Sequence, residues 1–373
     1  MIYLDYNATT PTDARVLEAM LPYFTQKFGN AASSSHAWGW TAAEAVAKAR
    51  EQLAYLIGAS EQELVFTSGA TEAINLAIKG VAEVYAEKGK HIVTVQTEHK
   101  AVLDVCQRLE KQGYNLTYLP VNEGGLIDLE ELEKAITPQT ILVSVMYANN
   151  ETGVLQPISE IAQLVHQKGS LFMSDGVQAV GKIPVKVEEL GIDLLPMSGH
   201  KFYAPKGVGA LYVRRRNPRV RLTALIDGGG HERGLRSGTL NVPAIVGMGA
   251  AAEIAQTEMY AEVKRLQMLR DKLENALLAT GKIWLNGDKE KRLAHVANLQ
   301  FSSLSSEMFL KKCRNLAVST GSACTSALMQ PSHVLRAMGL SEKAAYNSIR
   351  MSLGRFTTEA EIEKTIENIL QVL

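Results

Sequence analysis

The sequence of 373 residues predicts an α/β protein with a large, mostly parallel sheet and a smaller α+β unit. Two observations support this prediction. Short apolar runs rich in β-branched residues alternate with amphipathic helical segments from residue 42 to residue 213, as in a parallel sheet covered on both faces. Beyond about residue 244 the pattern changes to one long helical stretch followed by shorter elements. A chain of this length exceeds one typical domain.

The elements of the larger unit follow in a regular order. Helical periodicity covers 42–56 and stops at Gly58, a strand follows at 64–66, and the segment 67–72 opens a helix that runs to about residue 88. Further helices are expected at 101–111, 129–136 and 158–167. Further strands are expected at 92–95, 116–119, 141–146, 171–173, 193–195 and 210–213, the last of them antiparallel.

The second unit begins with helical periodicity over 244–280, which we expect to link two domains. Strands at 282–285, 296–301 and 348–353 and helices at 307–312, 332–338 and 359–370 complete it. We predict a large domain at 15–255 and a small domain made of 1–14 and 256–373. A cleft between the two is the expected place for a site.

Composition argues against several classes of partner. The formal net charge is zero, so we expect neither direct nucleic-acid binding nor a membrane partner. The basic run 214–216, with Arg219 and Arg221, is local; it is expected to cap a strand end or line an interface, with phosphate-backbone binding as the alternative. The first eleven residues lack the pattern of a signal peptide, and no later stretch is apolar enough to span a bilayer. We expect a cytoplasmic protein.

The three cysteines, at positions 106, 313 and 324, are odd in number and widely spaced. This argues against a disulfide framework and a CxxC metal site, and we expect no intrinsic metal. Cys106 lies on the apolar stripe of a helix and Cys313 near a helix end, so both are expected to be structural. Cys324 lies among small polar residues at 319–326, which predicts an exposed, mobile thiol suited to a nucleophile. A bystander on a turn is the alternative.

A lysine and a carboxylate occupy the ends of two predicted strands. In Ser198-Gly199-His200-Lys201 the lysine is well placed to hold an aldehyde cofactor as a Schiff base. Asp175 can lie under the same ring and keep a pyridine nitrogen protonated. Together they suggest pyridoxal 5'-phosphate (PLP). The alternatives are an ordinary polar loop and a strand-end cap.

Further candidates lie at the carboxyl ends of successive predicted strands, where open α/β sheets bind ligands. Gly69-Ala70-Thr71 opens a helix and can cradle a phosphate, although capping by Thr67 or Ser68 is the alternative. His99 can stack on the ring. Asn150 and Gln178 can reach its phenolic oxygen.

Eight motifs give the chain a family resemblance. They resemble those of cysteine desulfurases, a class V aminotransferase group of fold-type-I PLP enzymes, in the subgroup with a long mobile cysteine loop. The motifs are Leu4-Asp5-Tyr6-Asn7-Ala8-Thr9-Thr10-Pro11, Thr67-Ser68-Gly69-Ala70-Thr71-Glu72, Thr97-Glu98-His99-Lys100, Asn149-Asn150-Glu151-Thr152-Gly153, Ser198-Gly199-His200-Lys201, Gly228-Gly229-Gly230-His231-Glu232-Arg233-Gly234, Gly321-Ser322-Ala323-Cys324 and Ser348-Ile349-Arg350-Met351-Ser352-Leu353-Gly354. Gly176 departs from the family pattern, which generally has alanine there.

The resemblance implies a role for each matching residue. Lys201 would bind the cofactor and move the substrate α-proton, and Cys324 would attack the substrate sulfur. The implied cofactor contacts are Asp175 on the pyridine nitrogen, His99 on the ring as a further catalytic residue, Gln178 and Asn150 on the phenolic side, and Ala70, Thr71, Ser198 and His200 on the phosphate. Thr239 would reach the phosphate of the other subunit of a homodimer. Arg350, with Asn150, would bind the substrate, its guanidinium clamping the carboxylate.

The implied reaction is removal of sulfur from L-cysteine, giving L-alanine and a persulfide on Cys324. An iron–sulfur scaffold protein or a tRNA thiolation enzyme would accept the sulfur, and Cys324 could be a transient cluster ligand. One alternative is a selenocysteine lyase or another class V PLP enzyme, such as an aminotransferase. Remoter alternatives are a nucleotide-binding dehydrogenase, suggested by Gly207-Val208-Gly209 and Gly228-Gly229-Gly230, and a non-catalytic sulfur-relay protein.

Overall fold

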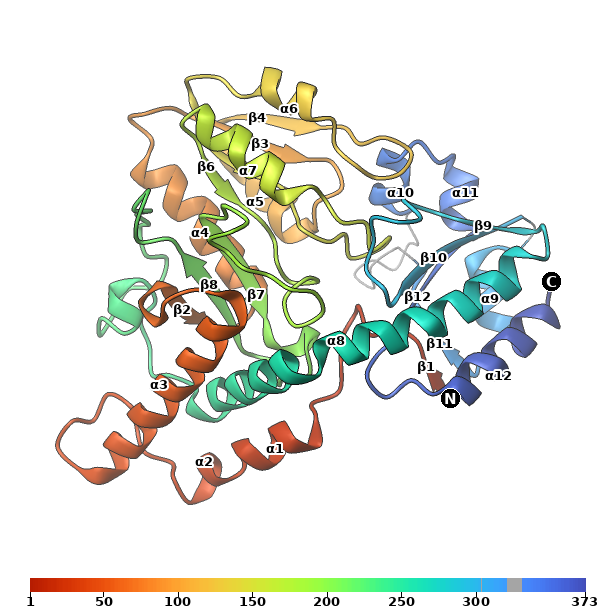
Figure 1. Ribbon diagram of the computed structural model, residues 1–373. Coiled ribbons are helices and arrows are strands. Elements are labelled where there is room, and N and C mark those ends of the chain that lie inside the picture. The colour runs from red at the N-terminus through yellow and green to blue at the C-terminus, as the bar shows by residue number, and fades with distance from the viewer. Residues whose placement is uncertain (303, 321–330) are drawn as a thin grey trace.

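The computed structural model describes residues 1–302, 304–320 and 331–373. A seven-stranded sheet with helices against it forms the larger part, and two short sheets with their helices form the smaller part (Figure 1). The predicted α/β class with a second, smaller α+β unit is therefore confirmed.

The large sheet contains every strand predicted for it. Its strands are β2 (Leu64–Thr67), β3 (His91–Val95), β4 (Asn115–Leu119), β5 (Thr140–Ser144), β6 (Leu171–Met173), β7 (Leu194–Ser198) and β8 (Gly209–Val213). They are ordered β2-β8-β7-β6-β5-β3-β4. Strand β7 continues past its predicted end at 195 to Ser198, and so includes Pro196. Only β8 runs antiparallel to its neighbours, as predicted. The other strands therefore end at one edge of the sheet.

Alternate residues of these strands enter two different cores, because successive side chains point to opposite faces of a sheet. Val93 and Val143 lie in one buried cluster, whereas their neighbours Ile92 and Leu142 lie in the other. Burial on both faces explains why the strands are continuously apolar in the sequence.

Helices connect these strands. They are α3 (Ala37–Ile57), α4 (Ala70–Val84), α5 (Lys100–Glu110), α6 (Leu129–Ala135) and α7 (Ile158–Gln167). Helix α3 starts five residues before the predicted position 42, with His36 as its N-cap. Two helices, α1 (Ala14–Met20) and α2 (Pro22–Thr25), were not predicted.

The predicted long helix is confirmed as α8 (Val242–Leu278). It packs against α1 and α3 in its first part and reaches α12 (Glu359–Leu370) of the smaller unit (Figure 1). The predicted domain boundary at 255/256 falls inside this helix and stays a prediction.

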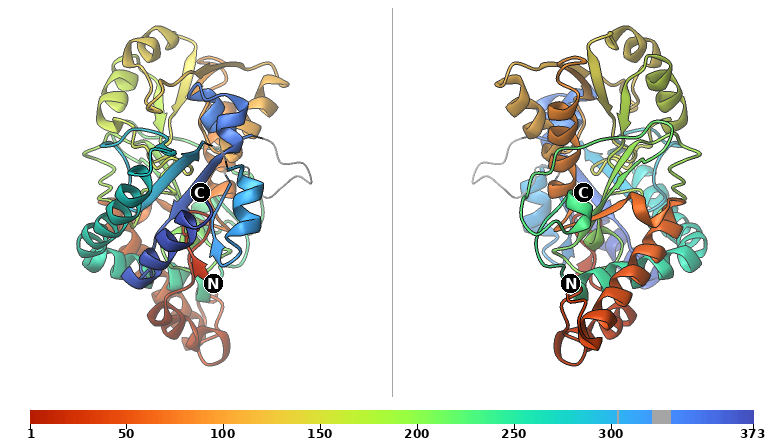
Figure 2. Two further views of the ribbon diagram at one scale, coloured as in Figure 1. Left: turned by 90° about the vertical axis from the view of Figure 1, so that its right-hand side faces the viewer. Right: turned by 90° about the vertical axis from the view of Figure 1, so that its left-hand side faces the viewer.

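The smaller unit contains an antiparallel sheet, ordered β12-β10-β9, and a parallel pair of β1 with β11. These strands are β1 (Ile2–Tyr3), β9 (Ile283–Leu285), β10 (Val296–Phe301), β11 (Leu316–Ala317) and β12 (Ser348–Ser352). The helices besides α12 are α9 (Ser306–Lys312), α10 (His333–Ala337) and α11 (Glu342–Tyr346). The described residues also form the 3-10 turns η1 (Glu61–Glu63), η2 (Gly199–Lys201) and η3 (Glu232–Gly234), which lie in other parts of the chain. Both termini lie in the smaller unit (Figure 2).

Residue Leu4 shares a core cluster with residues between 266 and 369, so the first residues of the chain fold with the last hundred. Within the described ranges, no helix has both the length and the apolar character needed to cross a membrane.

Candidate active site

Four adjacent strands end beside one another and bring the predicted ring-binding residues to one edge of the sheet. Lys201 follows β7, Asp175 follows β6, Asn150 follows β5, and His99 follows β3. The loops are joined across the edge: the N–H of Tyr147 donates to the Asp175 carbonyl at 3.0 Å. The N–H of Met146 donates to the Glu98 carboxylate at 2.5 Å.

Lys201 lies in the turn η2 directly after β7. Its Nζ donates to the main-chain oxygens of Asn7 at 2.6 Å and Ala8 at 2.9 Å. Burial, and then the charge of Arg350, lower the pKa of its amine to about 8, against the opposing effect of Asp175. A larger share of the amine is therefore unprotonated, and nucleophilic, near neutral pH than for an ordinary lysine.

Asp175 is buried, and its Oδ1 accepts the N–H of Val177 at 2.9 Å. Burial raises the pKa of its carboxyl to about 6, although Val177 and Lys201 act in the opposite direction. The following Gly176 has a packing reason, because an added Cβ would lie 2.6 Å from Cδ1 of Leu195. The departure from the family's alanine is therefore matched to this chain's core.

His99 is the N-cap of α5, and its Nδ1 accepts the N–H of Ala101 at 3.1 Å. The residue is exposed. Desolvation, followed by the charges of Lys201 and His333, lowers the pKa of the imidazole. With Nδ1 accepting a main-chain hydrogen bond, Nε2 is the ring nitrogen left to hold a proton.

The Gly69-Ala70-Thr71 turn has no side-chain cap. Thr67 instead donates its hydroxyl to the Gly69 carbonyl at 3.0 Å, and the Ser68 N–H donates to Glu72 at 2.8 Å. The capping alternative is therefore wrong. The first N–H groups of an α-helix have no carbonyl partner within the helix, so those of α4 can bind an anion.

Ser198 lies beside this turn, and His200 follows it in η2. A Cβ built on Gly69 would lie 3.9 Å from the Ser198 hydroxyl oxygen. Nδ1 of His200 is 3.1 Å from the Thr9 hydroxyl, and burial lowers the pKa of the ring to about 4, which keeps it neutral at physiological pH. The structure thus places Ser198 beside the predicted phosphate cradle, whereas the hydrogen bond of the His200 side chain is to Thr9, and its part in the cradle stays a prediction.

Arg350, on β12, faces the sheet edge from the smaller unit. Its guanidinium donates to the Asn150 carbonyl at 2.8 Å and pairs with Asp5 at 2.6 Å. Two buried atoms here, Nε of Arg350 and Oδ1 of Asn150, lack a hydrogen-bond partner in the described residues. Unpaired buried polar groups are costly, so each of these two atoms is a candidate for binding a polar ligand.

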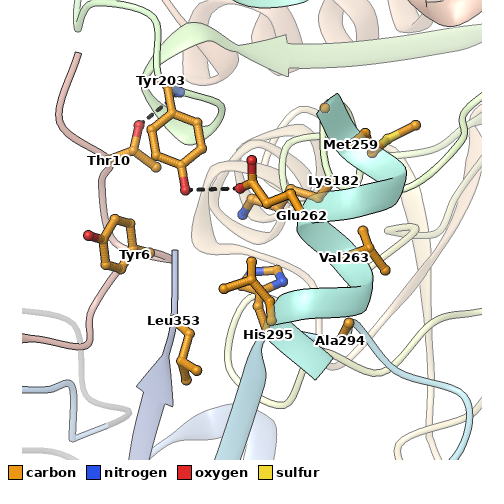
Figure 3. A pocket seen from close by; sticks show the side chains of 12 residues that line it. Tyr6, Thr10, Lys182, Tyr203, Met259, Glu262, Val263, Ala294, His295 and Leu353 are labelled. Atoms are coloured by element: carbon orange, nitrogen blue, oxygen red, sulfur yellow. Dashed lines mark hydrogen bonds between the residues drawn. The ribbon is translucent and has the colours of Figure 1, made fainter. Parts of the chain in front are cut away.

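Gln178 is held from two sides. Its amide nitrogen donates to the Asn7 carbonyl at 2.9 Å, and its amide oxygen accepts from Lys182 at 2.6 Å. Lys182 also lines a pocket of about 20 Å³ next to α8 (Figure 3). Glu262, which accepts the Tyr203 hydroxyl, and His295 line the same pocket. That volume suits a single buried water.

Cys324 lies outside the described residues, but the chain on both sides of it contacts the site. Before it, Ser319 exchanges main-chain hydrogen bonds with Arg350. After it, the Ser332 hydroxyl donates to the Glu151 carboxylate at 2.5 Å, and Nε2 of His333 is 2.9 Å from the Glu98 carbonyl. Thr239 is exposed on the chain that leads into α8, and within the described residues no hydrogen bond joins it to the other candidates.

Sequence reasoning gave no role to several residues that the structure brings to this edge. They are Asp5, Asn7, Glu98, Glu151 and Lys182. The first four lie inside motifs that were already singled out, so a charged or amide side chain within a motif was the available signal. Lys182 had no such signal, because its partner Gln178 lies one helical turn earlier in a segment without a helical pattern.

Known proteins resemble this chain over nearly its whole length. The aminotransferase class-V family matches residues 2–365. Cysteine desulfurase IscS of Rickettsia africae (strain ESF-5) is 55% identical over 99% of this chain and 90% of that protein. Cysteine desulfurase IscS of Anaeromyxobacter dehalogenans (strain 2CP-C) is 56% identical over 98% of this chain and 90% of that protein.

Solved structures agree. One titled a NifS-like protein has a TM-score of 0.92 at 40% identity, covering 100% of both chains. The structure of SspA in complex with cysteine has a TM-score of 0.85 at 38% identity, covering 96% of this chain and 100% of that one. The predicted fold-type-I class is confirmed, and the family depends on PLP. The chain belongs to the class-V aminotransferase family and, within it, to the cysteine desulfurases.

Proposed function

We propose that this protein removes sulfur from L-cysteine with the help of PLP, giving L-alanine and a persulfide on Cys324. The observation that carries the proposal is the placement, at adjacent strand ends, of the Lys201 amine and the buried Asp175 carboxyl. The 55% identity to a cysteine desulfurase over nearly the full chain supports the choice of reaction.

The residues present fit PLP. A lysine amine of lowered pKa, a buried carboxylate and uncapped helix N–H groups match its aldehyde, pyridine nitrogen and phosphate. We assign the aldehyde to Lys201 and the pyridine nitrogen to Asp175. We assign the phosphate to the cradle with Ser198 and His200, and the phenolic oxygen to Asn150 with Gln178. The cradle residues are Ala70 and Thr71. When bound, PLP supplies an electron sink for the electron pair that develops on the substrate α-carbon.

The chain's own residues bind the substrate and move its protons. Arg350 can turn its unpartnered Nε to the carboxylate of L-cysteine while Asn150 and Asp5 hold the rest of the guanidinium. Lys201 takes the proton from the α-carbon, because its lowered pKa makes it a base near neutral pH. His99 would pack against the ring of bound PLP and can hold a proton on Nε2.

The sulfur transfer forms one bond and breaks one. The Cys324 thiolate attacks the substrate sulfur, and the new S–S bond forms as the Cβ–S bond of L-cysteine breaks. The electron pair of the broken bond stays on carbon, where it takes up a proton to give the methyl group of L-alanine. No outside oxidant or reductant is needed, because the β-carbon keeps the two electrons that the sulfur atoms lose in forming the S–S bond.

The active form in this proposal is a homodimer in which Thr239 reaches the phosphate of the other subunit. Four large aromatic side chains support an interface near α2 and the start of α3, since they are 51–63% exposed. They are Phe24, Phe28, Trp38 and Trp40. Sedimentation should therefore give a dimer, stabilised by PLP; a fully active monomer would contradict this part of the proposal.

The sulfur acceptor is proposed to be an iron–sulfur scaffold protein or a tRNA thiolation enzyme, with Cys324 as a transient ligand of a cluster being built. We place the protein in the cytoplasm. The two described cysteines, Cys106 and Cys313, are free and buried, which suits a reducing compartment.

Product analysis tests the reaction. Purified protein with PLP and a thiol reductant should release L-alanine and sulfide in equal amounts from L-cysteine. Release from L-selenocysteine alone would favour the selenocysteine-lyase alternative, and transamination without sulfide would favour an aminotransferase. A nucleotide spectrum in place of an imine band would favour the dehydrogenase; the glycine-rich Gly207-Val208-Gly209 leads into β8 rather than into a helix, which argues against it.

A further inference from the structure

The segment 232–239, which carries Thr239, is hydrogen-bonded to β2, the strand before the phosphate cradle. In η3, the buried Glu232 receives two hydrogen bonds from Arg50, at 2.7 and 2.9 Å. The same carboxylate accepts the N–H of Phe66 on β2 at 2.7 Å.

A second contact, an ion pair, lies nearer to Thr239 and involves the helix turn of the cradle. Arg236, three residues before Thr239, pairs through Nε with Glu72 at 2.9 Å. Glu72 directly follows Thr71, and its other oxygen accepts the N–H of Ser68. The Glu72 carboxylate therefore links Ser68, at the start of the cradle turn, to Arg236 in the segment that carries Thr239.

The ionisation state of the Glu72 carboxyl bears on phosphate binding. Partial burial alone would raise the pKa of its carboxyl, but the hydrogen bonds from Arg236 and Ser68 outweigh burial and the pKa is lowered. Glu72 is thus ionised at neutral pH on the first turn of the helix that is proposed to bind a phosphate dianion. Uncompensated, this charge would repel the phosphate.

We infer that Arg236 is a positioning residue for the cofactor phosphate, which neutralises Glu72 at the cradle and keeps the Ser68–Thr71 turn open to an anion. The inference rests on the proposed PLP site and deepens it. Both side chains of the pair are largely shielded from solvent, with 23% and 16% exposed, so salt screens this pair less than an open surface pair. Arg236 contributes through Glu72 and needs no contact with the cofactor.

A double-mutant cycle on PLP affinity tests the inference. The dissociation constant of PLP is measured by absorbance or fluorescence titration of the apoprotein for the parent, Glu72→Gln, Arg236→Met and the double variant. Arg236→Met should weaken PLP binding about tenfold, since it leaves one unpaired charge near the phosphate. Glu72→Gln should stay within about threefold of the parent, and the double variant should return to within about threefold of Glu72→Gln.

Two further variants sharpen the comparison. Lys272→Met breaks an ion pair with Glu359 (2.7 Å) in the smaller unit and should leave PLP affinity unchanged. Arg236→Lys keeps the charge and should bind PLP nearly as the parent does. If Arg236→Met does not fold, as judged by circular dichroism, Arg236→Gln takes its place in the cycle.

Unchanged affinity in the Arg236→Met variant would overturn the inference. A double variant as weak as Arg236→Met would also overturn it, because Arg236 would then act through the Thr239 segment and not through the charge of Glu72. Failure of the proposed function looks different: the parent itself would bind no PLP.

Discussion

The amine of Lys201 is held 2.6 Å from the main-chain oxygen of Asn7, a residue that is 194 positions earlier in the sequence. The same oxygen accepts the Gln178 amide at 2.9 Å. The Asn7 side chain reaches both units: Nδ2 donates to the Asn150 carbonyl at 3.1 Å, and Oδ1 lies 2.9 Å from Nε2 of His295. The first residues of the chain thus close the site between the two units.

Asn7→Ala should destabilise the protein, because it leaves the buried His295 without its partner and removes a link between the units. We expect the free energy of unfolding to fall by about 1–3 kcal/mol, the cost of an unpaired buried polar group. Urea denaturation measures it. Asn115→Ala, at an exposed position on β4, is the control and should change stability little; equal losses in both variants would refute the assigned link.

The rate of PLP incorporation should depend on pH through Lys201. Only the unprotonated amine attacks an aldehyde, and the pKa of Lys201 is lowered to about 8. The rate at which apoprotein develops the imine absorbance should therefore rise with pH and level off above about 8. A rate that keeps rising to pH 10, as for an ordinary lysine, would show that the amine is not perturbed. Lys201→Ala is the control and should keep its fold without the absorbance.

Arg350→Lys should weaken substrate binding more than it slows turnover. A lysine cannot reproduce the planar donor set that contacts Asn150 and Asp5 and leaves Nε for a carboxylate. We expect KM for L-cysteine to rise about tenfold or more, with a smaller change in kcat. Arg314→Lys, at an exposed position, provides the matched control. An unchanged KM would remove Arg350 from the substrate site.

The sequence was sufficient for the elements of the large sheet, because strands buried on both faces leave a continuous apolar signal and glycines mark the helix ends. Strand β6 was predicted with its observed bounds, 171–173. Helix α1 was missed although Asp13 caps it and Val16 and Met20 are buried one turn apart. A short helix of seven residues gives too little periodicity to stand out.

Long-range pairing could not be read from local patterns. Strand β1 has two residues, and its register with β11 joins Ile2 to Leu316. The positions of Asp5 and Asn7 in the site follow from that pairing, so their motif was visible in the sequence while their partners were not. Likewise the contact of Glu98 with Met146 depends on β3 and β5 being neighbours in the sheet.

Sulfur transfer to Cys324 is the central claim, and labelling with L-[35S]cysteine tests it most directly. In the holoprotein without reductant, the label should become bound to the chain in the parent, Cys106→Ser and Cys313→Ser, be released by dithiothreitol, and map to the peptide that contains Cys324. Cys324→Ser should bind PLP and L-cysteine but carry no label and form almost no L-alanine, because a serine hydroxyl stays protonated near neutral pH. Parent-level label and L-alanine in Cys324→Ser, or loss of both only in Cys106→Ser or Cys313→Ser, would contradict the account.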